Sequence, residues 1–161
     1  MNRVEETTAF INKMFFGKKD KYEIMFGCAH LIGVAGFAEL LAMKRGLDKE
    51  ICKIAGLLHD YITYETGDSE AHAKRGSKAV YGYLDEIGGF SEDEKLLISS
   101  MIRRHGAKRK VDGAYEEVLK DADTLSHYFN SPDNWLASKE TDRFTALCIE
   151  LGFSVDGFKS R

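Results

Sequence analysis

The stretch GLLHD, residues 56–60, contains the only His-Asp doublet of this chain. An imidazole nitrogen and a carboxylate oxygen both bind divalent transition metals, although two such ligands alone hold an ion weakly. Neighbouring side chains on a helix diverge by about 100°. His59 and Asp60 can therefore converge on one point only if that point lies beyond the end of a helix. The doublet predicts part of a metal site, with further ligands supplied from elsewhere in the chain.

The other candidate ligands are far from the doublet in sequence. His30 lies in a long apolar stretch, His72 lies near the start of a later helix, and His105 follows another. The segment KDADTL offers Asp121 and Asp123, which point about 160° apart on a helix, so only one of them can face an ion. A lone histidine among apolar residues is more often a hydrogen-bonded core residue than a ligand. Periodicity alone does not choose between the two acids, although Asp121 lies nearer the apolar face.

Helices separated by glycines must bring these residues together. The apolar spacing predicts helices over residues 4–16, 22–45, 48–59, 69–87 and 91–105, one that starts near residue 115, and a last one over residues 138–151. Asp48 is an expected N-cap, and Ser91 with Glu94 forms a capping box. SPDNW, residues 131–135, is expected to be a turn. Because no alternating segment rivals these patterns, we expect an all-α fold.

Composition limits the classes of protein that fit. The 161 residues suffice for one domain, and the net charge of −3 argues against a general nucleic-acid binder. Acidic residues stand where a signal peptide would be apolar, and we expect no uninterrupted apolar stretch long enough to span a bilayer, so we expect a cytoplasmic protein without membrane contact. Three dispersed cysteines without CxxC spacing predict reduced, buried thiols.

The ordered set of motifs resembles the HD domain superfamily of metal-dependent phosphohydrolases. The motifs are a histidine in a long helix, GLLHD at the end of the next, HAKRGS, a helix ending in RRHG, and DADTLSHY. The resemblance covers roughly residues 20–130. It implies a single all-α domain over residues 1–161, a bundle of about six to eight helices, with an N-terminal helix and a C-terminal helical extension outside the core.

The resemblance also implies a ligand set for a divalent metal ion, namely His30, His59, Asp60 and Asp123. Asp121 remains the alternative to Asp123. His72 and His105 match positions that supply further ligands in two-metal branches of the superfamily. In single-metal branches such residues would contact the substrate phosphate or relay a proton, and we expect one ion rather than two. The residue types do not distinguish Mn, Fe, Ni, Co, Zn or Mg.

The activity implied is hydrolysis of a phosphate ester by metal-activated water. The substrate would be a nucleotide or another small phosphorylated molecule, and its identity and ester type are left open, as is the oligomeric state. Several branches place an acid four residues after the histidine of the doublet, where this chain has Thr63; Glu65, and then Asp68, are the expected bases instead. The cations expected at the phosphate are Lys74, Arg75, Arg104 and Lys108.

Two other readings stay open at this stage. The fold could be a metal-stabilised sensing or binding module without turnover, or a plain helical bundle for protein interaction. The presence of His72 and His105 beside arginines favours catalysis, because a purely structural ion would not require them.

Overall fold

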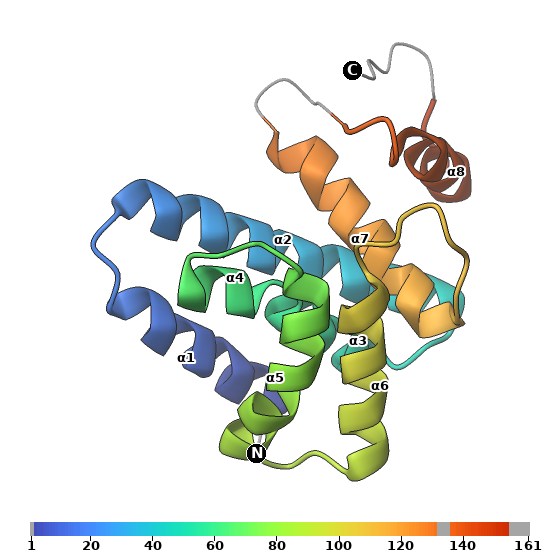
Figure 1. The fold of residues 1–161 in the computed structure, drawn as a ribbon. Helices are drawn as coiled ribbons and strands as arrows, with labels where there is room; N and C mark the ends of the chain where they lie inside the picture. The colour runs from blue at the N-terminus through green and yellow to red at the C-terminus, as the bar shows by residue number, and fades with distance from the viewer. Residues whose placement is uncertain (1, 132–135, 155–161) are drawn as a thin grey trace.

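The computed structural model describes residues 2–131 and 136–154, and all regular elements of these residues are helices (Figure 1). They are α1 (Arg3–Phe16), α2 (Lys21–Arg45), α3 (Lys49–Leu58), α4 (Tyr61–Thr66), α5 (His72–Ile87), α6 (Glu92–Arg104), α7 (Ala114–Asn130) and α8 (Thr141–Leu151). The all-α class predicted from the sequence is confirmed. Most of the predicted turn over residues 131–135 lies outside the described residues.

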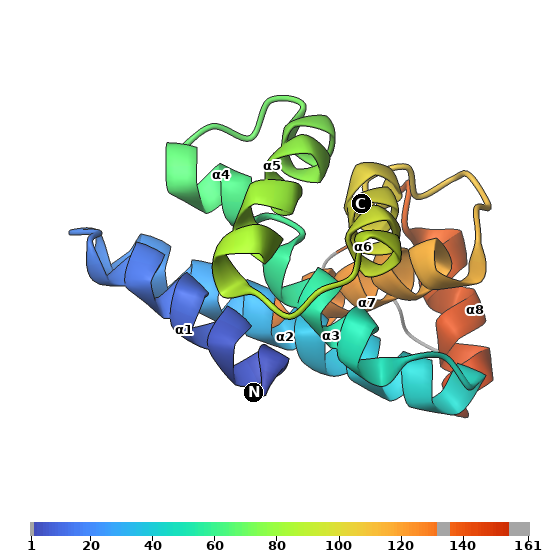
Figure 2. The same ribbon diagram turned by 90° about the horizontal axis from the view of Figure 1, so that it is seen from below.

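Helix α2 is the longest element, and α3 and α7 make the most extensive packing against it. Helices α5 and α6 lie side by side as a pair whose α6 member contacts α3 and α7 (Figures 1 and 2). Helix α1 packs on α3, and α8 packs on α7. The ends of α3, α5 and α6 and the middle of α2 and α7 thereby meet around one region of the bundle.

Helix α2 forms the middle of the hydrophobic core. Leu31, Val34 and Leu41 on one of its faces are fully buried. By length and composition alone α2 could cross a membrane, although Glu39 interrupts its apolar residues. Its buried face packs against α3 and α7, which is the arrangement of a core helix.

Several helix boundaries follow the predicted capping residues. The Asp48 side chain accepts hydrogen bonds from the first turn of α3, and Ser91 with Glu94 forms the predicted capping box of α6. Helix α4 was not predicted, because it is only six residues long and leads into the polar stretch TYETGDSE. Helix α5 starts at His72 rather than near residue 69, after Ala71 adopts a left-handed conformation with φ of 47°.

Helices α2 and α3 approach closely at Gly56. A Cβ atom placed on this glycine would lie 2.7 Å from the Cα atom of Ala35 and 2.9 Å from its nitrogen. Backbone atoms cannot move aside as a flexible side chain can. A glycine is therefore required here for α3 to carry the His-Asp doublet at this distance from α2.

We expect Gly56→Ala to lower the free energy of unfolding by about 1–3 kcal/mol, because the overpacking outweighs the better helix propensity of alanine. The control is Gly82→Ala in α5, where an added Cβ meets nothing within 4 Å. That change should stabilise the protein by about 0.5–1 kcal/mol. Urea unfolding of both variants measures the difference, and equal effects would contradict the close approach.

Candidate metal centre

The His-Asp doublet occupies the junction between α3 and α4. His59 keeps helical backbone angles at the end of α3, whereas Asp60 (φ −113°, ψ 10°) leaves the helix and starts α4. The Asp60 side chain makes no capping hydrogen bond to α4, although it stands at the N-cap position. Its carboxylate is therefore available to the region beyond the end of α3, as the sequence argument requires.

Four side chains from α2, the α3–α4 junction and α7 meet at one point. The Nε2 atoms of His30 and His59 lie 3.1 Å apart. Asp60 Oδ2 lies 3.6 Å from His30 Nε2 and 3.5 Å from His59 Nε2. Asp123 Oδ1 lies 3.4 Å and 3.7 Å from the same two nitrogens. Ligands about 2.0–2.2 Å from a shared ion are separated by about 3–3.5 Å, so these four donors fit one divalent metal.

A second group of donors uses the other oxygen of Asp60. His72 and His105 place their Nε2 atoms 3.2 Å apart, from the start of α5 and the end of α6. Asp60 Oδ1 lies 3.4 Å from the first and 3.3 Å from the second. The two oxygens of one carboxylate thus face two histidine pairs, which is an arrangement suited to bridging two ions.

Two buried oxygen atoms of this cluster have unmet hydrogen-bonding capacity. Asp60 Oδ1 and Asp123 Oδ1 accept no hydrogen bond from any described residue, although imidazole nitrogens lie near both. Leaving such an atom unsatisfied costs about 1–3 kcal/mol, and more when it is charged. Donor atoms that converge on a common point, rather than bonding to one another, fit a cation at that point. The residues present therefore fit a metal.

The histidines are held so that Nε2 faces the cluster. His59 Nδ1 lies 2.8 Å from Gly56 O, His72 Nδ1 lies 2.9 Å from Ser69 O, and His105 Nδ1 lies 2.6 Å from Ile102 O. A carbonyl oxygen can only accept, so each Nδ1 carries the proton and each Nε2 keeps its lone pair in the neutral ring. Backbone carbonyls of the preceding helical turn thus set both the tautomer and the aim of these rings.

Lys108 forms a buried ion pair with Asp123, one of the candidate ligands. Its Nζ atom lies 2.6 Å from Asp123 Oδ2, and its side chain is almost completely buried. Burial alone would raise the pKa of the Asp123 carboxyl, but Lys108 and the nearby imidazoles hold that pKa far below its ordinary value. The lysine therefore keeps Asp123 ionised and leaves Oδ1 free for the cluster.

The charges at the centre favour a cation. Burial opposes ionisation of Asp60, yet His59, with His105 and His30, holds the pKa of this carboxyl well below its ordinary value. Burial also opposes protonation of His59, but Asp60 and Asp123 outweigh it and raise the pKa of the imidazole to about 9. The field that favours a proton here also favours a divalent ion, which would have to displace that proton.

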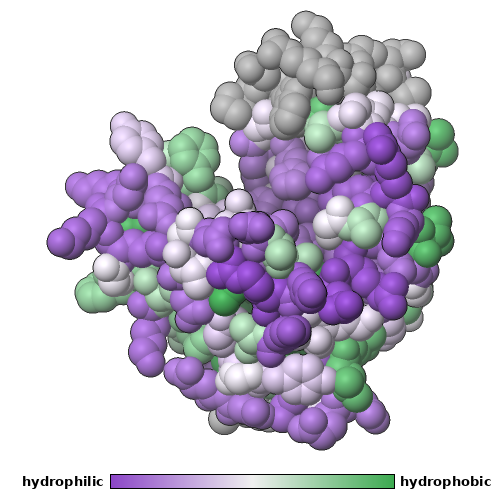
Figure 3. All heavy atoms as spheres, viewed as in Figure 1, coloured by the Kyte–Doolittle hydropathy of each residue, from purple (hydrophilic) through white to green (hydrophobic). Residues whose placement is uncertain are grey.

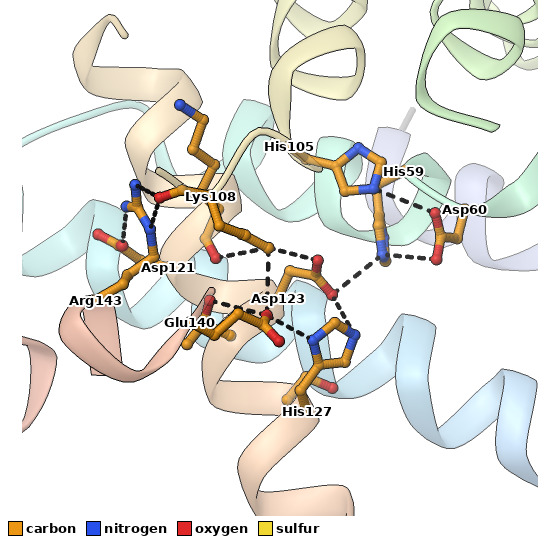
Figure 4. A network of polar contacts seen from close by, with 12 residues as sticks. His59, Asp60, His105, Lys108, Asp121, Asp123, His127, Glu140 and Arg143 are labelled. Atoms are coloured by element: carbon orange, nitrogen blue, oxygen red, sulfur yellow. Dashed lines mark hydrogen bonds and ion pairs between the residues drawn. The ribbon is translucent and has the colours of Figure 1, made fainter. Parts of the chain in front are cut away.

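The structure separates the two acids that the sequence left open. Asp123 points into the cluster, whereas Asp121 pairs with Arg45 and Arg143 on the other side of α7 (Figure 4). Residues two apart on a helix face opposite ways, as expected.

Other residues predicted for the site lie elsewhere. Glu65 accepts a hydrogen bond of 2.6 Å from the Tyr83 hydroxyl, in a separate pocket between α1, α4 and α5. Further side chains are engaged in ion pairs of 2.6 Å, namely Asp68 with Arg75 and Arg104 with Asp112. Lys74 is exposed. The structure brings His72, His105 and Lys108 to the cluster and does not bring Glu65 or Asp68 there.

Sequence reasoning missed two residues at the centre. His127 lies one turn after Asp123 on α7, with its Nε2 atom 3.3 Å from Asp123 Oδ1. Its other nitrogen lies 2.8 Å from Oε1 of the buried Glu140. The i,i+4 spacing from Asp123 places His127 on the same face of α7, and this signal was present in DADTLSHY. Nothing in the sequence indicated Glu140.

The cluster is accessible from a surface pocket of about 350 Å³ between α2, α4 and α7. Its lining includes His30, Asp60, Tyr64, His127 and Asn130. The face of the molecule seen in Figure 3 is mostly hydrophilic, with small apolar patches between polar side chains. The residues that line the pocket are themselves mostly polar, and they include the buried or half-buried ligand residues His30 and Asp60.

The amino-acid sequence of the chain matches a known protein family. The family model of the HD domain matches residues 28–128, which contain every residue of the two donor groups. The chain belongs to the HD domain family. The superfamily consists of metal-dependent phosphohydrolases, and it binds divalent metals through histidines and aspartates such as those gathered here. The resemblance inferred from the sequence motifs is confirmed.

Curated relatives are similar over part of their length. The chain is 27% identical over 121 residues to a ribonuclease Y of Desulfotalea psychrophila, 29% over 98 residues to one of Opitutus terrae, and 28% over 131 residues to one of Mycoplasmoides gallisepticum. These matches cover 65, 60 and 76% of this chain but only 23, 17 and 22% of the relatives. No solved structure matches the chain at a comparable level of significance.

We expect Mn²⁺ to raise the midpoint of thermal unfolding, because the donor groups around Asp60 and Asp123 are assembled only in the folded state. When the free Mn²⁺ concentration is 100 times the dissociation constant, the free energy of unfolding rises by about 2.7 kcal/mol. Asp60→Asn should abolish most of this rise. Asp121→Asn is the matched control: it should lower the starting midpoint by breaking its arginine pairs but retain the rise with Mn²⁺. A rise lost in Asp121→Asn and kept in Asp60→Asn would contradict the assignment.

Proposed function

We propose that this protein is a metal-dependent phosphohydrolase that cleaves a phosphate ester of a nucleotide or another small phosphorylated metabolite. The observation that carries the proposal is the position of Asp60, whose two carboxylate oxygens face two separate histidine pairs. A structural ion needs one closed set of ligands, whereas this arrangement spreads donors over two adjacent positions beside a pocket. Membership of a phosphohydrolase family supports the same conclusion.

We further propose two ions instead of the single ion expected from the sequence. One would be held by His30, His59, Asp60 and Asp123, and the other by His72, His105 and Asp60. Divalent ions at such positions polarise a phosphoryl oxygen and lower the pKa of coordinated water toward neutrality. The second position has fewer protein ligands, so it offers more room for a substrate oxygen.

Backbone contacts and burial fix the orientation of the histidine rings that would hold the ions. Carbonyl oxygens fix the rings of His59, His72 and His105, so the donor atoms need little reorganisation when substrate binds. His72 is about one third exposed, whereas His59 and His105 are almost fully buried. The phosphate would therefore approach from the His72 side or from the pocket beside His30.

The pocket volume favours a small substrate. A volume of about 350 Å³ lies within the common range for small-molecule sites, about 300–1,000 Å³. The net charge of −3 gives little general attraction for a long polyanion. RNA is the second candidate, because the curated relatives are named ribonuclease Y. The chain spans only about a fifth of those relatives, so this name supports RNA only weakly.

A substrate panel with the metal-loaded protein tests the proposal. It should contain p-nitrophenyl phosphate, bis-p-nitrophenyl phosphate, nucleotides and a short RNA, with His59→Ala and Asp60→Ala as inactive references. We expect hydrolysis of at least one small phosphate ester that both variants abolish. Cleavage of RNA alone would favour the second candidate. A wild-type protein that binds metal but is as inactive as the variants on every substrate would favour a non-catalytic module.

We expect Glu65→Gln to leave kcat nearly unchanged, because the Glu65 carboxylate is bound to Tyr83 in another pocket. Loss of a general base usually lowers kcat by about 10²–10⁴-fold. Steady-state kinetics on the best substrate of the panel measures the effect. A fall of that size in Glu65→Gln, with normal metal content, would mean that the α4 region moves to the centre during catalysis.

A further inference from the structure

His127 shares two neighbours of the metal cluster, Asp123 and His30. Its ring stacks parallel to that of His30, with centroids 5.3 Å apart and planes 6° apart. Its Nε2 atom lies 3.3 Å from Asp123 Oδ1, close to the 3.4 Å that separates His30 Nε2 from the same oxygen. His127 lines the pocket, with 41% of its side chain exposed.

The tautomer of His127 is set by Glu140. Oε1 of this buried carboxylate lies 2.8 Å from Nδ1 of the ring and also accepts a hydrogen bond from the Thr124 hydroxyl. The ring therefore holds a proton on Nδ1, and the lone pair of a neutral ring is on Nε2. Glu140 stands at the N-cap of α8 but makes no capping bond there, so its carboxylate is committed to this contact (Figure 4).

Two acceptor atoms then face each other. In the neutral ring, the lone pair on His127 Nε2 and the unsatisfied Asp123 Oδ1 lie 3.3 Å apart without a hydrogen bond between them. Two electron-rich atoms at this distance repel each other unless a proton or a metal ion lies between them, and a bound metal ion would replace that proton. The same geometry is found at all five histidines: Nδ1 lies against a protein oxygen atom and Nε2 faces the centre. In chain order from His30 to His127, the residues that contact Nδ1 are Ser126, Gly56, Ser69, Ile102 and Glu140.

We propose that His127 is a further ligand of the ion held by His30, His59, Asp60 and Asp123, and that Glu140 is the positioning residue that orients it. A carboxylate behind a metal-bound histidine fixes the ring and raises its basicity. This inference rests on the metal site in the proposed function and adds a ligand to it. Glu140 lies beyond residues 28–128, so the C-terminal extension would complete the centre.

Co²⁺ binding to the full chain tests the inference without relying on activity. Titrations followed by visible absorption report both affinity and coordination. The variants are His127→Ala, Glu140→Gln and the double variant, with His127→Gln as a replacement if the alanine variant is unstable. Glu150→Gln is the matched control, because Glu150 is a carboxylate of α8 that pairs with Arg45 instead of facing the centre.

We expect His127→Ala to weaken Co²⁺ binding at the position next to His30 and His59 by at least about 10-fold and to change the absorption spectrum. Glu140→Gln should weaken binding by about 10-fold, within the range for supporting residues. The double variant should bind no more weakly than His127→Ala, because Glu140 acts through His127. Glu150→Gln should match the wild type in both affinity and spectrum.

Three results would overturn the inference. Unchanged Co²⁺ affinity and spectrum in His127→Ala would exclude a ligand role, even if activity fell. A further loss in the double variant would mean that Glu140 acts independently of His127. If the wild type itself binds no Co²⁺, Mn²⁺ or Zn²⁺, the proposed metal-dependent function fails together with the inference, and this outcome is distinct from a failure of His127 alone.

Discussion

The rest of the site depends on two buried, ionised carboxylates, Asp60 and Asp123, whose negative charge must be balanced by nearby positive charge. An ionised carboxylate is costly to bury unless opposite charge and hydrogen bonds surround it. Lys108 neutralises the outer oxygen of Asp123, and histidine rings from α2, the α3–α4 junction, α5 and α6 surround the remaining oxygens. Helix packing in this protein is thus arranged to collect donors around a position for positive charge.

The architecture explains how distant residues reach that position. Helix α2 carries His30 from its middle, because its apolar face fits between α3 and α7. The close approach at Gly56 holds the end of α3 against α2 and so sets the distance between His30 and the doublet. Each of these constraints is a packing requirement, and together they determine the geometry of the centre.

The helical class, most helix boundaries and part of the metal site were predictable from the sequence. Apolar periodicity and glycine punctuation gave the helical class and most boundaries, and capping residues such as Asp48 and Ser91 marked two helix starts. The separation of the acids in KDADTL follows from helical geometry alone, which states that only one can face an ion. The sequence did not show which one, because that depends on the arginines that pair with Asp121 from α2 and α8.

Other features depend on tertiary contacts that no local pattern encodes. Glu140 reaches His127 across 13 positions, and its role follows from the docking of α8 on α7. Glu65 is near the doublet in sequence, yet α4 turns it toward Tyr83. The bridging position of Asp60 arises because the chain leaves the helix between residues 59 and 60, so that each oxygen meets a different pair of rings.

Anomalous diffraction from crystals grown with Mn²⁺ is the most direct test of the central claim that Asp60 lies between two metal positions. The account predicts anomalous peaks on both sides of the Asp60 carboxylate, one next to His30 and His59 and one next to His72 and His105, separated by about 3.5–4 Å as in other two-metal sites. Well-ordered crystals at neutral pH with saturating Mn²⁺ and no anomalous peak within coordinating distance of Asp60 would contradict it.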